Sequence, residues 1–282
     1  MTTLPFFPGT TPRASRALLP TMNPPIAHWR GQRVWVVGAS SGIGAELART
    51  LHRRGARVAL SARRADALAR VLDGAQPAGA PADAVLLPLD VNDADAVAAA
   101  CRELCERWGG IDLVLWVAGI YQPMRAQNFD LPAARRMLDT NLGSVLNGLG
   151  AVLPVLLEQR AGGLALVSSV AGYSGLPHAL VYGPTKAALI NLAESLYLDL
   201  SPQGIGVYLV NPGYVDTPAT AGNAYRMPAL ISAEQAADAT LEGIAAGRFE
   251  VHFPRRFTRW LKIARLLPYR AYFALVRRVV GL

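Results

Sequence analysis

The sequence is poor in the residues that build disulfide frameworks and metal sites. Its 282 residues include two cysteines, Cys101 and Cys105, which lie four positions apart. Two thiols at this spacing are too few for a disulfide scaffold or a complete zinc site, so we expect no metal and interpret them as partly buried thiols in a reducing cytoplasm. No uninterrupted apolar run reaches about 18 residues, and we therefore predict no membrane-spanning helix.

Lysine is also scarce, because Lys186 and Lys262 stand against 26 arginines. Where this chain needs a generic cation it uses arginine, so a lysine at a defined position suggests a need for a compact ammonium group. Tyr182 lies four residues before Lys186, and in a helix the two side chains would share a face. A cation at that distance favours the phenolate form, which makes Tyr182 a candidate proton donor and acceptor.

The net charge of +8 is confined to one end of the chain. Residues 1–247 hold 19 basic and 19 acidic residues, whereas residues 248–282 hold nine basic residues and Glu250 alone. A neutral body with one basic end argues against a broad surface that tracks nucleic-acid phosphates. We therefore expect no nucleic-acid partner.

Three regions differ in composition. Residues 1–30 are rich in proline and threonine, lack the order of a secretory signal and are predicted to be a disordered extension, with Met22 as an alternative start. Residues 31–252 form a single predicted catalytic domain. Residues 253–282 form a basic amphipathic segment.

Short apolar runs alternate with helical patterns from Arg33 onward, which is typical of βαβ units around a parallel sheet. Expected strands lie at 34–37, 58–60, 85–87, 113–117, 164–167, 207–210 and 249–253, and expected helices at 42–54, 93–108, 131–158 and 182–200. Pro154 should bend or break the third helix. The pattern predicts a doubly wound α/β domain with six to seven parallel strands.

A glycine-rich turn follows the first expected strand and opens a helix. Glycines there let the backbone approach a pyrophosphate, and the helix N-terminus offers free amides to it. The residues of this turn expected to contact a cofactor are Gly38, Ser40, Ser41, Gly42, Ile43 and Gly44.

The end of the second expected strand indicates which dinucleotide binds. An NAD site usually has Asp or Glu there to hold the ribose hydroxyls, but this chain has Arg63 and Arg64. Two guanidinium groups can hold a 2'-phosphate, so NADP(H) is favoured over NAD(H).

Taken together, these features resemble the short-chain dehydrogenase/reductase family over about residues 31–252. The resemblance implies a Rossmann-like fold, a catalytic tetrad and further cofactor contacts. The tetrad would be Asn141, Ser169, Tyr182 and Lys186; the further contacts would be Asp90, Val91, Ala118, Gly119, Pro212, Gly213, Val215 and Thr217, with Tyr182 and Lys186 also touching the cofactor.

The resemblance implies an NADP(H)-dependent oxidoreductase that interconverts a carbonyl and an alcohol. Tyr182 would exchange the proton with the substrate oxygen, Lys186 would support Tyr182 and hold ribose hydroxyls, and Ser169 would orient the substrate. Asn141 would anchor a water molecule that links Lys186 to solvent. Strand alternation turns Ser168 away from this site. The family also implies a homodimer or homotetramer.

The chain departs from the family pattern in two places. The family's Asn-Asn-Ala-Gly is Trp116, Val117, Ala118 and Gly119 here, and Val37 stands where threonine is common. Strand support must therefore come from other side chains. The departures leave a second hypothesis open, in which the protein binds NADP(H) as a sensor or scaffold without turnover.

Substrate specificity is expected to lie in Tyr173, His178 and a mobile loop at 214–230, around an apolar pocket for a hydrophobic substrate. In the basic segment, apolar residues recur at helical spacing from Phe257 to Val280, beside arginines. Such a segment can pack on the body or on a second subunit, or lie on a membrane surface. The expected location is cytoplasmic, with membrane association left open.

Overall fold

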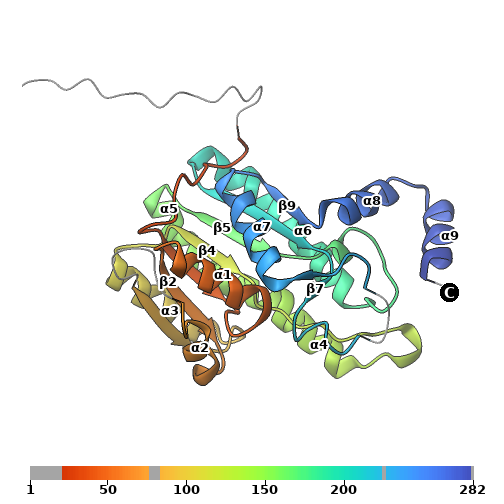
Figure 1. The fold of residues 1–282 in the computed structure, drawn as a ribbon, viewed down its shortest axis with the longest axis horizontal. Helices are drawn as coiled ribbons and strands as arrows, with labels where there is room; N and C mark the ends of the chain where they lie inside the picture. The colour runs from red at the N-terminus through yellow and green to blue at the C-terminus, as the bar shows by residue number, and fades with distance from the viewer. Residues whose placement is uncertain (1–20, 76–82, 224–226, 281–282) are drawn as a thin grey trace, which may run out of the picture.

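The computed structural model describes residues 21–75, 83–223 and 227–280, and a parallel sheet of seven strands forms its centre (Figure 1). The strand order is β3-β2-β1-β4-β5-β6-β9, and every neighbouring pair is parallel. The strands are β1 (Arg33–Val37), β2 (Arg57–Ala62), β3 (Ala84–Pro88), β4 (Leu113–Trp116), β5 (Gly163–Val167), β6 (Gly206–Pro212) and β9 (Glu250–Phe253). The predicted doubly wound Rossmann-like α/β fold is confirmed.

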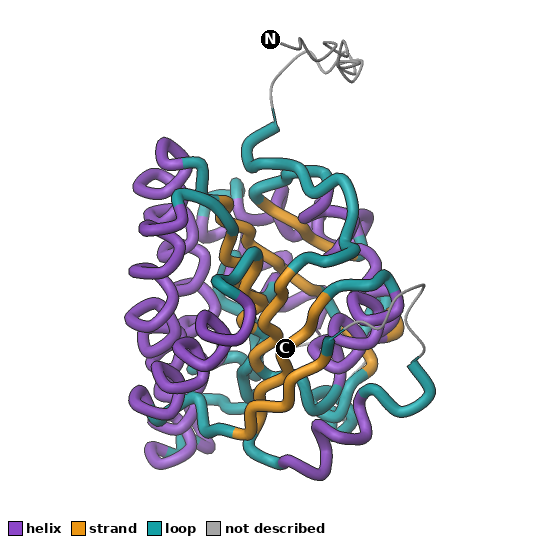
Figure 2. Tube along the Cα trace, turned by 90° about the vertical axis from the view of Figure 1, so that its left-hand side faces the viewer, coloured by secondary structure: helices purple, strands orange, loops and turns teal. Residues whose placement is uncertain are grey.

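Helices cover both faces of the sheet, as Figure 2 shows from the side. One core contains buried side chains of α3, α5 and α6, and the other contains those of α1, α2 and α7. The helices are α1 (Gly42–Arg53), α2 (Ala65–Val71), α3 (Ala94–Trp108), α4 (Leu131–Leu138), α5 (Ser144–Gln159), α6 (Tyr182–Leu200), α7 (Ala233–Ala245), α8 (Arg255–Arg265) and α9 (Tyr269–Val280). The central strands β1 and β4 are buried on both sides, which explains their continuous apolar runs.

Strand order reverses between β1 and β4. Chain direction along the sheet runs outward from β1 through β2 to β3, and then outward from β4 to β9 on the other side. Loops that leave the carboxyl ends of β1 and β4 therefore diverge, and the crevice between them is the place where doubly wound sheets bind ligands.

The helix predicted at 131–158 is interrupted, but not at Pro154. A π-helical turn, η2 (Asp139–Gly143), separates α4 from α5, and α5 continues through Pro154. Pro154 and Gly150 are both exposed, so the Gly150 carbonyl that loses its helical partner faces the outside. Of the expected bend or break at Pro154, the break does not occur, and the bend stays a prediction. The interruption lies instead at the π-helical turn that contains Asn141.

The stretch Leu131–Gln159 is long and apolar enough by composition to cross a membrane. Val145, Leu149, Val152 and Leu156 of α5 nevertheless pack into the main core of the domain. Core helices of α/β domains have the same length and composition, so we interpret this stretch as one of them.

The N-terminal stretch is not wholly an extension. Residues 21–30 pack on the body, where Trp29 is buried and the Asn23 side chain donates to the Val207 carbonyl at 2.7 Å and accepts from the Val207 amide at 3.0 Å. The predicted disorder of residues 1–30 is thus wrong for 21–30, because one buried amide side chain satisfies a strand edge. Residues 1–20 of that prediction lie outside the described residues.

Other elements escaped the sequence analysis. The helices α2 and α7 and the short pair β7 (Val215–Asp216) and β8 (Ile231–Ser232) were not predicted. α7 begins with a capping box between Ser232 and Gln235, a local signal that could have been found. The loop predicted at 214–230 therefore contains a strand, and its residues 224–226 lie outside the described residues.

Candidate active site

A large cleft of about 2130 Å³ opens at the carboxyl ends of the strands. All predicted cofactor contacts line it, together with Ser169 of the predicted tetrad. They are Gly38, Ser40, Ser41, Gly42, Ile43, Gly44, Arg63, Arg64, Asp90, Val91, Ala118, Gly119, Tyr182, Lys186, Pro212, Gly213, Val215 and Thr217. Asn141 does not line the cleft but is buried behind it.

Two positions in the turn after β1 must be glycine, because neighbouring backbone atoms leave no room for a side chain there. A Cβ atom on Gly38 would lie 2.5 Å from the Ala118 amide nitrogen, and one on Gly44 would lie 2.1 Å from the Gly38 carbonyl oxygen. Gly38 also has φ +91°, which side chains disfavour. The turn is therefore pressed against the end of β4 and the start of α1, which fixes the direction in which α1 begins.

The N-terminus of α1 is built to receive an anion. Its N-cap residue, Ser41, makes no side-chain capping bond, and the first turn contains no acidic residue. The amides of that turn, which line the cleft near Gly42, keep their hydrogen-bonding capacity and the positive end of the helix dipole. The residues present thus fit the pyrophosphate of a dinucleotide.

Cations end the second strand beside this turn. Arg63 and Arg64 are exposed and line the cleft. The nearest carboxylate along the chain, Asp66, is paired with Arg70 at 2.7 Å. The end of β2 therefore presents two guanidinium groups that could bind a phosphate, and it presents no unpaired carboxylate that would repel one.

Lys186 lies at the floor of the cleft. Its ammonium group donates to the Val167 carbonyl at 3.0 Å and lies 5.6 Å from the centroid of the Tyr182 ring. The side chain is buried, and burial lowers the pKa of Lys186 to about 8. A Cβ atom on Gly119 would lie 3.3 Å from its Nζ atom, so the absent side chain at Gly119 leaves room for the ammonium group.

Asn141 joins the end of β4 to α6. Its Oδ1 atom accepts from the Ile120 amide at 2.7 Å, and its Nδ2 atom donates to the Ile120 carbonyl at 2.9 Å and to Thr185 Oγ1 at 3.1 Å. Both Nδ2 hydrogens and one acceptor site of Oδ1 are therefore already in use. The predicted water link to Lys186 stays a prediction, for which Asn141 retains one Oδ1 lone pair and its main-chain carbonyl.

The two adjacent serines are held in different ways. Ser168 donates to the Lys186 carbonyl at 2.7 Å and is tied to the backbone of α6. Ser169 accepts from the Ala171 amide at 3.1 Å and donates only weakly to the Pro212 carbonyl at 3.4 Å. Of the two hydroxyls, that of Ser169 is the one available to a ligand.

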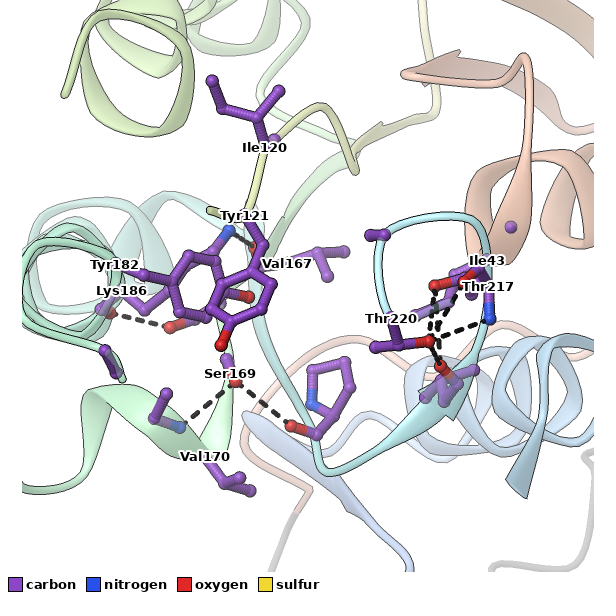
Figure 3. A pocket seen from close by; sticks show the side chains of 18 of the residues that line it. Ile43, Ile120, Tyr121, Val167, Ser169, Val170, Tyr182, Lys186, Thr217 and Thr220 are labelled. Carbon is purple, nitrogen blue, oxygen red and sulfur yellow. Dashed lines mark hydrogen bonds between the residues drawn. The ribbon is translucent and has the colours of Figure 1, made fainter. Parts of the chain in front are cut away.

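The aromatic side of the site contains a residue that the sequence analysis missed. Tyr121 packs edge to face on Tyr182 with ring centroids 4.9 Å apart. In Figure 3 both rings and Ser169 point into the same part of the cleft, and Thr217 lies across from them. The position of Tyr121, two residues after Gly119 at the end of β4, could have identified it from the sequence as a residue of the site.

Tryptophan replaces the amide side chains that are missing at the end of β4. The Trp116 indole donates to Ser144 Oγ at 3.2 Å, and Ser144 donates to the Thr140 carbonyl at 2.6 Å inside the π-helical turn. A Cβ atom on Gly148 would lie 2.2 Å from the Trp116 ring, so glycine there makes room for the indole. The strand support that the sequence analysis sought comes from this contact.

The C-terminal helices form the outer wall of the cleft, an outcome that no motif predicted. We call residues 255–280, α8 and α9, the arm; its cleft-lining residues are Phe257, Trp260, Leu261, Ala264, Tyr272, Leu275, Val276, Val279 and Val280. The packing alternative is therefore correct for the inner face of the arm.

Glu250 of β9 fastens the arm. It accepts from Tyr173 Oη at 2.6 Å and from Asn211 Nδ2 at 2.9 Å, and it pairs with Lys262 of α8. Burial alone would raise the pKa of Glu250, but hydrogen bonds from Lys262, Tyr173 and Asn211 outweigh it and lower that pKa. Burial and the hydrogen bond to Glu250 raise the pKa of Tyr173. Tyr173 was predicted to affect substrate specificity, but it is not among the described residues that line the cleft.

His178 has φ +63° and lines the cleft, where its carbonyl accepts from the Met124 amide at 3.0 Å. Its backbone thus joins the loop before α6 to the loop after β4. Among the described residues, no group of three or more His, Cys, Asp or Glu residues has the arrangement of a metal site.

Comparisons with known proteins agree with this geometry. Residues 32–226 match the model of the short chain dehydrogenase family. An uncharacterized oxidoreductase of Myxococcus xanthus is 38% identical over 244 residues, which cover 86% of this chain and 96% of that protein. An uncharacterized oxidoreductase of Mycobacterium tuberculosis is 34% identical, over 70% of this chain and 78% of that protein.

Solved structures share the fold. A short-chain dehydrogenase from Burkholderia cenocepacia, solved with NADP, superposes with a TM-score of 0.75 at 24% identity and covers 88% of this chain and 98% of that one. A short-chain dehydrogenase/reductase from Mycobacterium marinum superposes with a TM-score of 0.71 at 27% identity, over 80% of this chain and 94% of that one. With the family model, the relatives and the cleft in agreement, this chain belongs to the short-chain dehydrogenase/reductase family, oxidoreductases that act on CH–OH and C=O groups.

Proposed function

We propose that the protein is an NADP(H)-dependent oxidoreductase that interconverts a carbonyl and an alcohol on a hydrophobic substrate. The observation that carries the proposal is the buried ammonium group of Lys186, which lies 5.6 Å from the Tyr182 ring at the floor of a dinucleotide-sized cleft. Burial of a cation costs free energy, so a buried lysine without a counter-ion is best explained by a function. Support of the phenol that transfers a proton is such a function.

In the proposed mechanism the residues of this chain move and hold a proton. Tyr182 donates the proton to the carbonyl oxygen during reduction and accepts it back during oxidation. Ser169 donates a hydrogen bond to the same oxygen, for which its weak bond to Pro212 leaves it free. Lys186 stabilises the phenolate that forms, and the bound cofactor supplies the hydride chemistry.

Preference for NADP(H) is supported by Arg63 and Arg64 and by the lack of a free carboxylate at the end of β2. Guanidinium groups hold phosphates through paired N–H donors, so they favour the 2'-phosphate. The neighbour from Burkholderia cenocepacia was solved with NADP, which supports binding of a nicotinamide dinucleotide here.

A hydrophobic substrate is supported by large apolar side chains in the lining of the cleft. They include Tyr121, Leu176, Leu261 and Val276. Such side chains favour a ketone, an aldehyde or an alcohol with an apolar body.

We place the protein in the cytoplasm as a homodimer or homotetramer. Support for assembly comes from Leu146 of α5 and Leu198 of α6, two large apolar side chains that are exposed on the body. The alternative of a sensor or scaffold without turnover has only Trp116 and Val117 in its favour.

The test is Tyr182→Phe. We expect NADPH oxidation with hydrophobic ketones or aldehydes to fall by about 10²–10⁴-fold because the proton donor is lost. NADPH binding, followed by fluorescence, should change little, and wild-type protein should bind NADPH more tightly than NADH. Turnover that is unchanged in the variant would overturn the mechanism, and a wild type without turnover on any carbonyl or alcohol would favour the sensor.

A further inference from the structure

The arm has a fixed inner face. Thr258 hydrogen-bonds His252 across 2.6 Å, Lys262 pairs with Glu250, and Tyr272 donates to the Gly175 carbonyl at 2.8 Å. Figure 1 shows α8 and α9 at one side of the molecule, reaching away from the sheet. The arm is thus anchored at its base while its far side is open to the surroundings.

The far side is strongly apolar. Leu266 and Tyr269, at the turn between the two helices, are 82% and 80% exposed. Trp260 is 72% exposed and also lines the cleft, so it lies at the border between the inner face and the far side. Ile263 and Phe273 are exposed beside them. Single exposed apolar residues are normal on a protein surface, but five large ones gathered in about fifteen residues mark an interaction surface.

All charged residues of the arm are basic. Residues 255–280 contain no Asp or Glu, and Glu250 just before them is already bound by Lys262. The arginines of the arm are all exposed, and no ion pair recorded for the described residues includes any of them. They are Arg255, Arg256, Arg259, Arg265, Arg270, Arg277 and Arg278.

Three of these cations do not stabilise the helix that carries them. Arg255, Arg256 and Arg259 lie in the first turns of α8, which has no acidic residue there, and cations at a helix N-terminus oppose the helix dipole. Glutamate at the same positions would stabilise the helix, whereas the basic residues in the last turns of α8 and α9 already agree with the dipole. The positive charge at the start of α8 is therefore better explained by what the arm binds than by how it folds.

We propose that the arm docks on the surface of an anionic phospholipid bilayer. Apolar side chains flanked by arginines match a surface that offers hydrocarbon beneath a layer of negative headgroups. A second copy of the chain fits less well, because residues 1–247 hold equal numbers of basic and acidic residues and so offer no net negative charge to the arm.

Docking would place the mouth of the cleft at the bilayer. Trp260, Leu275 and Val279 both belong to the arm and line the cleft. A substrate dissolved in the bilayer could then pass along apolar side chains toward Tyr182. This consequence rests on the proposed function, whereas docking itself can be measured without turnover.

The experiment is co-sedimentation of the full chain with phosphatidylcholine vesicles that contain or lack phosphatidylglycerol. We expect binding only with phosphatidylglycerol, and weaker binding at high salt because salt screens the headgroup charge. The double variant Leu266→Ser/Tyr269→Ser should bind at least about tenfold more weakly, because both apolar side chains are lost from the bilayer. Neither residue lines the cleft, so turnover of a water-soluble substrate should persist.

Matched controls separate the arm from the rest of the surface. Leu86→Ser removes a 40% exposed leucine from β3, at the edge of the sheet opposite β9, and should bind vesicles like wild type. Arg256→Glu should weaken binding by more than the roughly fivefold expected for loss of one cation near an anionic membrane, whereas Arg102→Glu on α3 should not.

Binding that does not depend on phosphatidylglycerol, or that survives in Leu266→Ser/Tyr269→Ser, would overturn the proposal. So would a dimer that forms without vesicles and is lost in that double variant, since the surface would then bind a second copy. Truncation after Pro254 is a poorer test, because it would leave Glu250 without its cation.

Discussion

The floor of the cleft and the arm that walls it each contain one of the two lysines of the chain, and their surroundings differ. Lys186 is buried without a carboxylate partner in the described part of the structure; its bond runs to the Val167 carbonyl, and its pKa falls to about 8. Lys262 is 37% exposed in its side chain and pairs with Glu250. The ammonium group of Lys186 is buried without a recorded counter-ion, whereas that of Lys262 is partly exposed and has Glu250 as its counter-ion.

The difference separates a group prepared for chemistry from a group that holds a structure. An uncompensated buried cation destabilises the fold and stabilises any negative charge that forms beside it, such as a phenolate on Tyr182. A paired cation has little left to offer a reacting group. In a chain that otherwise uses arginine, the buried position of Lys186 takes the compact ammonium group that fits beside Gly119.

The largest expected effect concerns activity. Lys186→Met should lower kcat for NADPH-dependent carbonyl reduction by about 10²–10⁴-fold, because the phenolate of Tyr182 loses its cation. Lys262→Met removes an ammonium group of the same size from the other wall, and its kcat should stay within about tenfold of wild type. Equal losses in steady-state kinetics of the two variants would break the comparison.

The cofactor side of the fold was readable from sequence because its signals are local. The turn from Gly38 to Gly44 must follow a strand and begin a helix, and both flanking elements had clear patterns. The spacing from Ser169 through Tyr182 to Lys186 likewise follows from one strand, one loop and one helix. Each of these groups needs only neighbours that are close in sequence.

The rest depended on contacts that no local pattern encodes. Asn23 bonds Val207 across 184 positions, and the π-helical turn that holds Asn141 depends on the Trp116 indole bonding Ser144. The arm's amphipathic pattern was visible, but the choice of face required knowing that Glu250 lies on the last strand beside α8. Tertiary placement decides such contacts.

The second expected effect is a dependence of the free energy of unfolding on pH, caused by the burial of Lys186. Burial lowers its pKa from the ordinary 10.5 to about 8, so between these pH values the unfolded chain binds more protons than the folded one. The free energy of unfolding should therefore rise with pH across this window, by up to about 3 kcal/mol from this residue. Lys186→Met should lack that rise.

Urea denaturation of wild type and Lys186→Met at several pH values between 8 and 10.5 measures the difference directly. Both proteins should carry Tyr182→Phe in this measurement, because the Lys186 cation would shift the titration of that phenol. The remaining tyrosines titrate alike in both proteins, so their contribution cancels when one curve is subtracted from the other. Parallel curves would mean that Lys186 keeps an ordinary pKa in the fold, and the claim of a desolvated cation would fail.

The smallest effect concerns the arm. Lys262→Met should lower the free energy of unfolding at pH 7 by about 1–2 kcal/mol, since Glu250 keeps only Tyr173 and Asn211 as donors and solvent screens part of the loss. The double variant Glu250→Gln/Lys262→Met should recover much of this, because no uncompensated carboxylate is left behind. Lys186→Met at the same pH should be neutral or stabilising, since it removes a buried charge instead of orphaning one. If the double variant is as unstable as Lys262→Met, the arm is held by packing of the aliphatic part of the Lys262 side chain and not by its charge. Only Lys186 would then owe its role to its ammonium charge.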